Sequence, residues 1–331
     1  IKNNITLSEL NLQAATEDLA KAKDDIRTAV AAAFVQVLYN NEILGVAHRQ
    51  VEIDSLQVDR LEAKARSGKA SQVEVSAQKS SLAQSRLTEV QAEGNLRVSL
   101  LDLTQLLELP SPDGFNVSLP DASQLEIHLL QDPQAIYETA LGIKPQIRSE
   151  QLRVDAADAS IRVAKASYYP SLSLSGGLGS NYYTNNLNPS KAFFEQLGNN
   201  FSQYVGLSLN IPIFQKFAVR NNVRSAQVSL AQQQLQLESV KKALYKEIQQ
   251  AHTNALTSQS KYERSKAAAV AAKEAFELME AKYENGKANI TEFNASKAQY
   301  LEAESNLTQA RYEYLYQTKL LDFYQGRELS L

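Results

Sequence analysis

The chain has 331 residues, with 34 basic and 37 acidic side chains and a net charge of −3. This balance, without a basic block or a basic–aromatic patch, gives no reason to expect binding to nucleic acid. The absence of cysteine excludes disulfides, thiolate metal ligands and cysteine nucleophiles. The three histidines, His48, His128 and His252, are far apart in the sequence and lack the spacing of a helical zinc site, so we expect no metal site.

Residues 1–109 contain no proline and are rich in Ala, Leu, Gln, Glu and Lys, which predicts very long helices. A Gly-Lys step at Gly68 interrupts them, and Ser71 is a candidate cap for a second helix. We interpret residues 1–109 as a helical hairpin with its turn near Gly68. An unbroken helix over residues 1–66 would be roughly 100 Å long. No run of about 18 apolar residues occurs, so we expect no transmembrane helix.

Prolines mark the middle of the chain, because all eight lie between Pro110 and Pro212. Residues 110–145 contain several of them, and we interpret this segment as a compact connector with short helical pieces. The composition of residues 146–169 returns to that of a long helix.

Residues 170–213 differ from the rest of the chain, because no charge occurs over residues 166–190 or 196–215. Apolar residues alternate with small ones along two segments, which predicts a pair of β-strands with one apolar face each. The apolar positions are Leu172, Leu174, Leu178, Val205, Leu207, Leu209, Ile211 and Ile213. Uncharged strands of about ten residues, bracketed by tyrosine and phenylalanine, are typical of a membrane β-barrel, and a soluble β-hairpin is the alternative.

Residues 214–331 predict a second helical hairpin, with a turn near Gly286 and Asn289 as the candidate cap. Apolar residues recur every three or four positions, as in the seam of a coiled coil, at Leu244, Ile248, Ala251 and Ala255. The first hairpin has the same rhythm at Ile26, Val30, Ala33 and Val37.

The two hairpins are copies of one repeat. The stretch EAKARSGKASQVEVSAQK begins at Glu62 and the similar EAKYENGKANITEFNASK begins at Glu280, an offset of 218 residues. The same offset aligns IKNNI at residues 1–5 with VRNNV at residues 219–223. The first copy lacks a counterpart of roughly residues 146–218, so we expect its inbound helix and strand pair to lie upstream of residue 1 in a longer protein. Two strand pairs in each of three protomers would give twelve strands, above the minimum of about eight for an outer-membrane barrel.

This order of elements resembles the TolC-like outer-membrane efflux protein family, the outer membrane factors of tripartite efflux pumps and type I secretion systems. The features that carry the resemblance are a long helix, YYPSLSLSGGLG, a second strand ending in NIPIF, another long helix, and a G-K-A turn, all within a duplicated pattern. The resemblance implies a mostly α-helical fold with a membrane β-hairpin. It implies a homotrimer with a 12-stranded β-barrel in the outer membrane of a Gram-negative bacterium, and an α-barrel that extends into the periplasm with the connector as an equatorial belt.

The implied function is a passive exit duct that is gated at the helical tips. In this family the tips contact a periplasmic adaptor, also called a membrane fusion protein, and through it an inner-membrane transporter. By their place in the motif, the implied adaptor contacts are Gly68, Lys69, Ala70, Ser71, Gly286, Lys287, Ala288, Asn289, Ile290 and Thr291.

The resemblance also implies a pore constriction near the tips, formed by Glu74, Glu292, Asn294 and Tyr283. A ring of such acids in a trimer would attract cations. The residues alone allow another interpretation of Glu74 and Glu292, since an acid near a helix N-terminus interacts favourably with the helix dipole. Ala295 stands where some members of the family have a second acid.

The main alternative to a duct is a soluble coiled-coil protein with a structural or interaction role. The uncharged segment over residues 166–215 favours the duct, because a soluble scaffold would carry charge on at least one strand face. We do not expect an enzyme or a cofactor, because the sequence has no phosphate-binding glycine loop, no nucleophile elbow and no histidine–acid constellation.

Overall fold

The structure is a computed structural model, and it describes residues 1–111, 114–115, 117, 130–184 and 192–329. The chain divides into two compact units. One unit consists of Ile1–Ala14 and Glu150–Leu237, and the other consists of Ala15–Ser149 and Glu238–Leu331.

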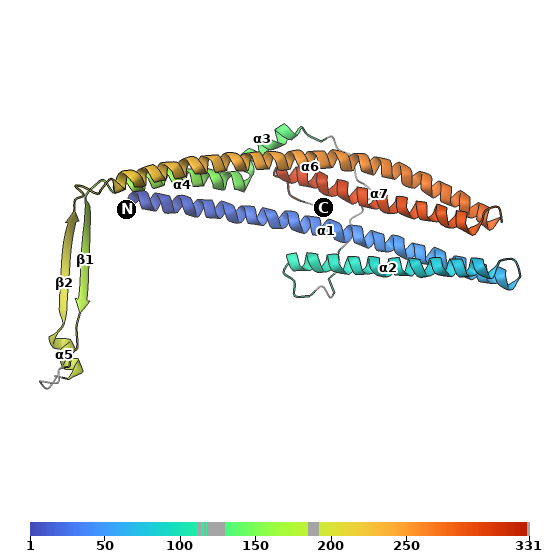
Figure 1. The fold of residues 1–331 in the computed structure, drawn as a ribbon, viewed down its shortest axis with the longest axis horizontal. Coiled ribbons are helices and arrows are strands. Elements are labelled where there is room, and N and C mark those ends of the chain that lie inside the picture. Colours follow the sequence, from blue (N-terminus) through green and yellow to red (C-terminus); the bar gives the residue numbers. More distant parts are fainter. Residues whose placement is uncertain (112–113, 116, 118–129, 185–191, 330–331) are drawn as a thin grey trace. The chain divides into compact units, whose positions relative to one another are not determined.

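The fold is mostly helical, with two pairs of long helices and one β-hairpin, as the sequence predicted (Figure 1). The elements in chain order are α1 (Lys2–Arg66), α2 (Gln72–Leu106), α3 (Pro133–Ile143), α4 (Pro145–Ala166), β1 (Ser171–Gly179), α5 (Phe193–Asn199), β2 (Ser202–Asn210), α6 (Ala218–Glu284) and α7 (Ile290–Tyr324). The predicted connector, residues 110–145, contains the short helix α3. Residues 112–113, 116 and 118–129 of the connector lie outside the described residues.

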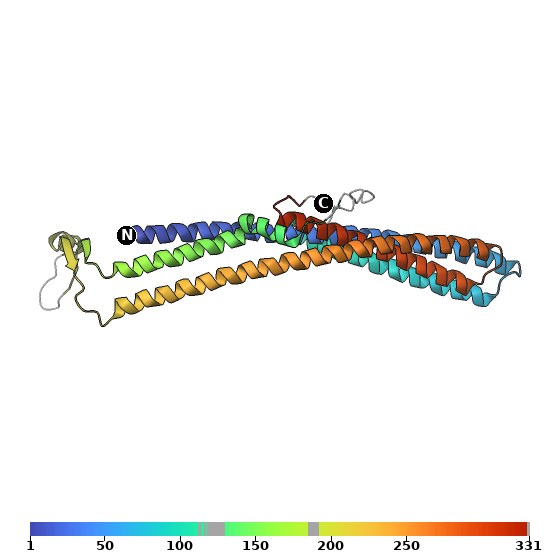
Figure 2. The same cartoon turned by 90° about the horizontal axis from the view of Figure 1, so that it is seen from above.

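The second unit contains two helical hairpins, except for the first parts of α1 and α6, which belong to the first unit. We call α1 with α2 hairpin one, and α6 with α7 hairpin two; Figures 1 and 2 show the helices of each hairpin side by side. The absence of proline and the high content of alanine and leucine permit helices of this length. The contacts between the hairpins described below all lie within this second unit.

The core of the second unit follows the predicted apolar rhythm in hairpin two and departs from it in hairpin one. Leu244, Ile248, Ala251 and Ala255 are all buried, as predicted. In α1 the prediction was wrong for Ile26, which is exposed. Val37 is buried as predicted, and Val35 and Leu38, which pack with Tyr312 of α7, are buried beside it.

The expectation that no helix could span a membrane was wrong by the criterion of hydropathy. Helix α1 contains an 18-residue window with a mean hydropathy of 1.3, which by length and composition alone is enough to cross a bilayer. Of that window, 33% is buried inside the structure. Core helices of soluble proteins pass the same test, so this window is weak support for a membrane span.

The two strands form an antiparallel pair whose register separates an apolar face from a small, polar one. Leu172 lies opposite Leu209, and Leu174 lies opposite Leu207. Cross-strand partners share a face, so these leucines form one apolar face, and the serines that alternate with them form the other. All six leucine and valine positions predicted within the strands are exposed: Leu172, Leu174, Leu178, Val205, Leu207 and Leu209.

The sequence placed the end of the second strand too far along the chain. Strand β2 ends at Asn210, so Ile211 and Ile213 lie beyond it. Pro212 explains the early end, because proline cannot donate a ladder hydrogen bond. Between the strands lies α5, which the sequence analysis did not predict.

Candidate functional site at the hairpin turns

The turn of each hairpin has the same backbone geometry. Gly68 and Gly286 have φ values of 73° and 68°, in the left-handed region that glycine adopts without strain. In hairpin one, the N–H of Lys69 donates to the carbonyl of Lys64 at 2.8 Å, and hairpin two repeats this bond between Lys287 and Lys282, also at 2.8 Å. Together with the shorter-range bond from each glycine, this is the Schellman pattern of a helix C-terminus.

The returning helices begin with capping boxes. The backbone N–H of Glu74 donates to the Ser71 hydroxyl at 3.2 Å, and the Glu74 carboxylate accepts from the Ser71 N–H at 2.7 Å. Asn289 and Glu292 repeat this exchange at 2.9 and 3.0 Å. The predicted caps are thereby confirmed, and both predicted acids have a structural role at a helix N-terminus.

Tyr283 lies between the two hairpins, close to the turns. Its ring stacks on that of Phe293 with centroids 5.0 Å apart, and the Lys64 ammonium lies 5.5 Å from its centroid. Burial, and then the charge of Glu74, raise the pKa of Tyr283 above its ordinary value. The side chain therefore stays a neutral hydrogen-bond donor at any physiological pH.

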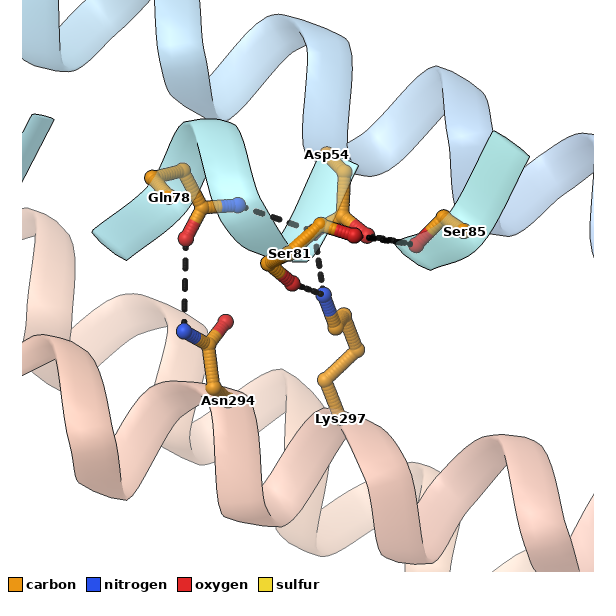
Figure 3. A network of polar contacts seen from close by, with 6 residues as sticks. All are labelled: Asp54, Gln78, Ser81, Ser85, Asn294 and Lys297. Carbon is orange, nitrogen blue, oxygen red and sulfur yellow. Dashed lines mark hydrogen bonds and ion pairs between the residues drawn. The ribbon is translucent and has the colours of Figure 1, made fainter. Parts of the chain in front are cut away.

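A buried polar network joins the hairpins further from the turns (Figure 3). Its centre is Asp54 of α1, which is fully buried. The Asp54 carboxylate accepts hydrogen bonds from Gln78 of α2, at 2.8 Å, and from the Ser85 hydroxyl of α2. It also forms an ion pair with Lys297 of α7, which is buried as well.

Asn294, a predicted pore residue, belongs to this network. Its side-chain amide donates to Gln78 at 3.3 Å, and its own carbonyl oxygen is buried without a hydrogen-bond partner. Lys297 completes its contacts with the Ser81 hydroxyl at 3.5 Å. The network thus links α1, α2 and α7, and it connects the two copies of the repeat.

The sequence analysis did not identify Asp54 or Lys297 as site residues. A signal was present in both helices. Asp54 stands at a buried position of the stripe that also contains Val58 and Leu61, and Lys297 stands midway between the buried Phe293 and Leu301. A lone charge at a core position predicts a buried partner, since an unpaired buried charge is very costly.

Three more ion pairs cross from α1 to hairpin two. Arg49 pairs with Glu304 at 2.5 Å, and Arg60 pairs with Glu284 at 2.7 Å. Glu42 pairs with Arg311. We call these and the Asp54–Lys297 pair the cross-hairpin ion pairs. Only the last is fully buried; the others are partly exposed and individually weak.

The described residues contain no group of three or more His, Asp or Glu side chains that could hold a metal ion. The site is therefore a set of turns, caps and polar contacts between helices. Its geometry suits the positioning of helix ends.

A comparison with family models decides the affiliation of the chain. The sequence model of the outer membrane efflux protein family matches residues 1–108 and 136–327. The chain belongs to this family. The duplicated hairpins and the exposed strand pair agree with this affiliation.

Individual relatives agree with this affiliation. The chain is 25% identical to outer membrane protein TolC of Escherichia coli over 288 residues, which covers 86% of this chain and 58% of TolC. The chain therefore spans little more than half of that relative. Among solved structures, a membrane protein from Pseudomonas aeruginosa has a TM-score of 0.79 at 18% identity. The match covers 99% of this chain and 73% of the Pseudomonas chain. The Campylobacter jejuni CmeC outer membrane channel has a TM-score of 0.77 at 18% identity. The match covers 100% of this chain and 69% of the CmeC chain.

Proposed function

We propose that this chain is part of a passive exit duct in the outer membrane, used by a tripartite efflux pump or a type I secretion system. The observation that carries the proposal is the β-hairpin, whose faces are both uncharged and exposed, on a chain that otherwise consists of long helical hairpins. The duct performs no chemical step, and an inner-membrane transporter supplies the energy.

The strand pair supports a place in the outer membrane. Its leucine face would contact lipid, and its serine face would line a water-filled lumen. In the described part of the chain the sheet has two strands, each with one unpaired edge. Hydrocarbon cannot satisfy such edges, so they require further strands. A trimer with two strand pairs per protomer provides a closed barrel of twelve.

Exposed apolar side chains on the hairpins support the homotrimer. Helix α2 exposes Val73, Leu87 and Val90, and α6 exposes Val270 and Leu278. Such side chains suit contacts with neighbouring copies in an α-barrel through the periplasm. In this arrangement residues 1–109 and 214–331 are the periplasmic hairpins, residues 110–145 the equatorial connector, residues 146–169 the inbound helix and residues 170–213 the membrane strands.

The turns are the surface proposed for the periplasmic adaptor. Lys69 and Lys287 are exposed beside the two turn glycines, and the rigid caps hold them in place. Glu74, Glu292, Asn294 and Tyr283 would narrow the pore behind the turns. The capping boxes hold both acids in fixed positions, as a constriction requires.

The test is export in a Gram-negative strain that lacks its own outer-membrane channel and carries the cognate adaptor and transporter. The full-length protein should restore export of a pump substrate. Lys287→Glu at the turn should reduce export while leaving the amount of assembled protein unchanged. Lys266→Glu, an exposed control in the middle of α6, should export normally. Failure of the full-length protein to restore export would contradict the proposal.

A further inference from the structure

The two segments that join the strand pair to the long helices leave the sheet at the same end, because Ser171 of β1 lies opposite Asn210 of β2. Both segments belong to the first unit. In the segment after β2, Lys216 and Phe217 have φ values of 48° and 64°, in the left-handed region. Two consecutive non-glycine residues there are strained, and such a conformation persists only where its surroundings favour it.

Contacts within the chain cover this strained turn only in part. Phe217 is 59% exposed, although Phe214 packs edge-on against its ring and the Arg220 guanidinium lies 4.5 Å from the ring centroid. We call the exposed side chains of residues 165–169 and 213–220 the junction surface. Exposed large side chains of this kind are typical of a site that contacts a partner or a membrane. On the junction surface they are Tyr168, Tyr169, Ile213, Phe214 and Phe217.

The charges of the junction surface are all positive. Lys165, Lys216 and Arg220 are exposed, and none of the three forms an ion pair with another residue that the structure describes. The surrounding sequence supplies no counter-charge, because no acid occurs over residues 159–194 or 196–237. The junction surface therefore combines exposed aromatic rings with basic groups that are free to bind an anion.

Another copy of this chain would not neutralise these charges. In a symmetric trimer every copy presents the same side chains at the same level, so the neighbouring surface is basic as well. The repeat adds to this charge, because the offset of 218 residues aligns Arg220 with Lys2. A lipid surface fits better, since the apolar strand face continues into the junction surface through the exposed Ile211 and Ile213. Aromatic rings beside Lys and Arg suit the boundary between hydrocarbon and anionic headgroups.

We infer that the junction surface binds the phosphate headgroups of anionic phospholipids in the periplasmic leaflet of the outer membrane. The inference rests on the proposed function, which places the strand pair in that membrane and the long helices in the periplasm. Ile213 and Phe214 then lie among the acyl chains, and Lys165, Lys216 and Arg220 donate hydrogen bonds to phosphate oxygens. Bound lipid supplies the surroundings that the strained turn at residues 216–217 lacks in the single chain.

The test measures which lipid lies beside the junction surface of the full-length protein. The chain has no tryptophan, so Phe214→Trp adds a fluorophore there, and the protein without this substitution gives the background emission. The protein is placed in vesicles of phosphatidylethanolamine and phosphatidylglycerol, with quenching bromine atoms on the acyl chains of only one of the two lipids. We expect phosphatidylglycerol, the anionic lipid, to be enriched about fivefold at the fluorophore for each basic residue that contacts it.

A matched pair of triple variants assigns this preference to the basic residues. Removal of the charges of the junction surface should make the two brominated lipids quench equally, whereas removal of three exposed charges from the middle of α6 should leave the preference unchanged. The first variant is Lys165→Gln, Lys216→Gln and Arg220→Gln, and the control is Lys242→Gln, Lys246→Gln and Lys266→Gln.

Equal quenching by the two lipids in the Phe214→Trp protein, no quenching by either, or an unchanged preference in the first triple variant would overturn the inference. Loss of the preference on addition of inorganic phosphate at constant ionic strength would overturn it too, because the site would then hold free phosphate. Conductance of the same protein in a planar bilayer tests the proposed function separately. A protein that conducts without a lipid preference contradicts only the inference, and one with the preference that does not conduct contradicts only the proposed duct.

Discussion

At the scale of single residues, the most consequential side chain is Asp54. Its carboxylate is fully buried and accepts hydrogen bonds from two neutral side chains in addition to its pairing with Lys297. A buried ion pair seldom stabilises a protein more than apolar packing would, but the loss of one partner is costly. The pair therefore specifies which surfaces meet more than it adds to stability.

Asp54→Ala should destabilise the protein by about 3–5 kcal/mol, because it leaves the Lys297 ammonium buried without a counter-charge. The double variant Asp54→Leu with Lys297→Met should recover most of that loss, since apolar packing replaces both charges. Thermal unfolding of the purified protein in detergent measures both effects.

The matched control is Asp25→Ala, which removes an exposed ion pair with Lys21 and should change stability by less than about 1 kcal/mol. If Asp54→Ala unfolds at the same temperature as this control, Asp54 is not paired in a buried network.

Tyr312 makes the stability of the packing between α1 and α7 depend on pH in the alkaline range. Its hydroxyl donates to Glu42 at 2.7 Å, and burial followed by that hydrogen bond raises the pKa of Tyr312 from 10.0 to about 12. Because the folded-state pKa lies above the unfolded value, the resulting stabilisation is complete below pH 10 and is lost as the pH rises through about 12.

Tyr312→Phe should therefore unfold at a temperature that falls less steeply than that of the wild type between pH 10 and about 12. At neutral pH the variant should be less stable by roughly 0.5–1.5 kcal/mol, because it lacks the hydrogen bond to Glu42. Thermal unfolding at a series of pH values measures both, and parallel curves for the two proteins would show that the hydroxyl does not titrate as described.

At the scale of elements, the turns are the part of the site that the sequence predicted best. Gly68, Gly286, Ser71 and Asn289 act through local geometry, and such signals can be recognised in a few consecutive residues. The strand pair could be predicted equally well, because the alternation of apolar and small residues is a local pattern. Its far end was misplaced, since Pro212 ended the ladder before the alternation ended.

The buried network could not be predicted in the same way. Asp54 and Lys297 are separated by 243 positions, and their meeting depends on how two hairpins pack. Nor did the rhythm show that Ile26 would be exposed while Val37 is buried. Local rhythm shows that a helix has an apolar face, but the choice between adjacent faces is made by tertiary contacts.

Removing the caps should loosen the turns without disrupting the hairpins. Ser71→Ala and Asn289→Ala should each cost about 0.5–2 kcal/mol, because each leaves a backbone N–H of the first helical turn without its side-chain acceptor. Hydrogen exchange should accelerate at residues 72–75 and 290–293, respectively, and remain unchanged in the middle of α6. Equal protection at the turns in wild type and variants would contradict the capping role.

At the scale of the whole molecule, the chain contains two copies of one helical hairpin. The two copies share turns, caps and helix lengths, and four ion pairs join hairpin one to hairpin two within the chain. The exposed strand pair favours the proposed assembly of several copies, because a two-stranded sheet with uncharged faces is not stable in water alone.

The central claim is that the assembled protein is a passive, water-filled conduit through the outer membrane. Its most direct test is the electrical conductance of the purified full-length protein in a planar lipid bilayer without any energy source. We predict stepwise insertion of a trimer that conducts ions continuously with no nucleotide or proton gradient. A protein that inserts no conducting unit and is recovered from cells in a salt-soluble form would contradict the account.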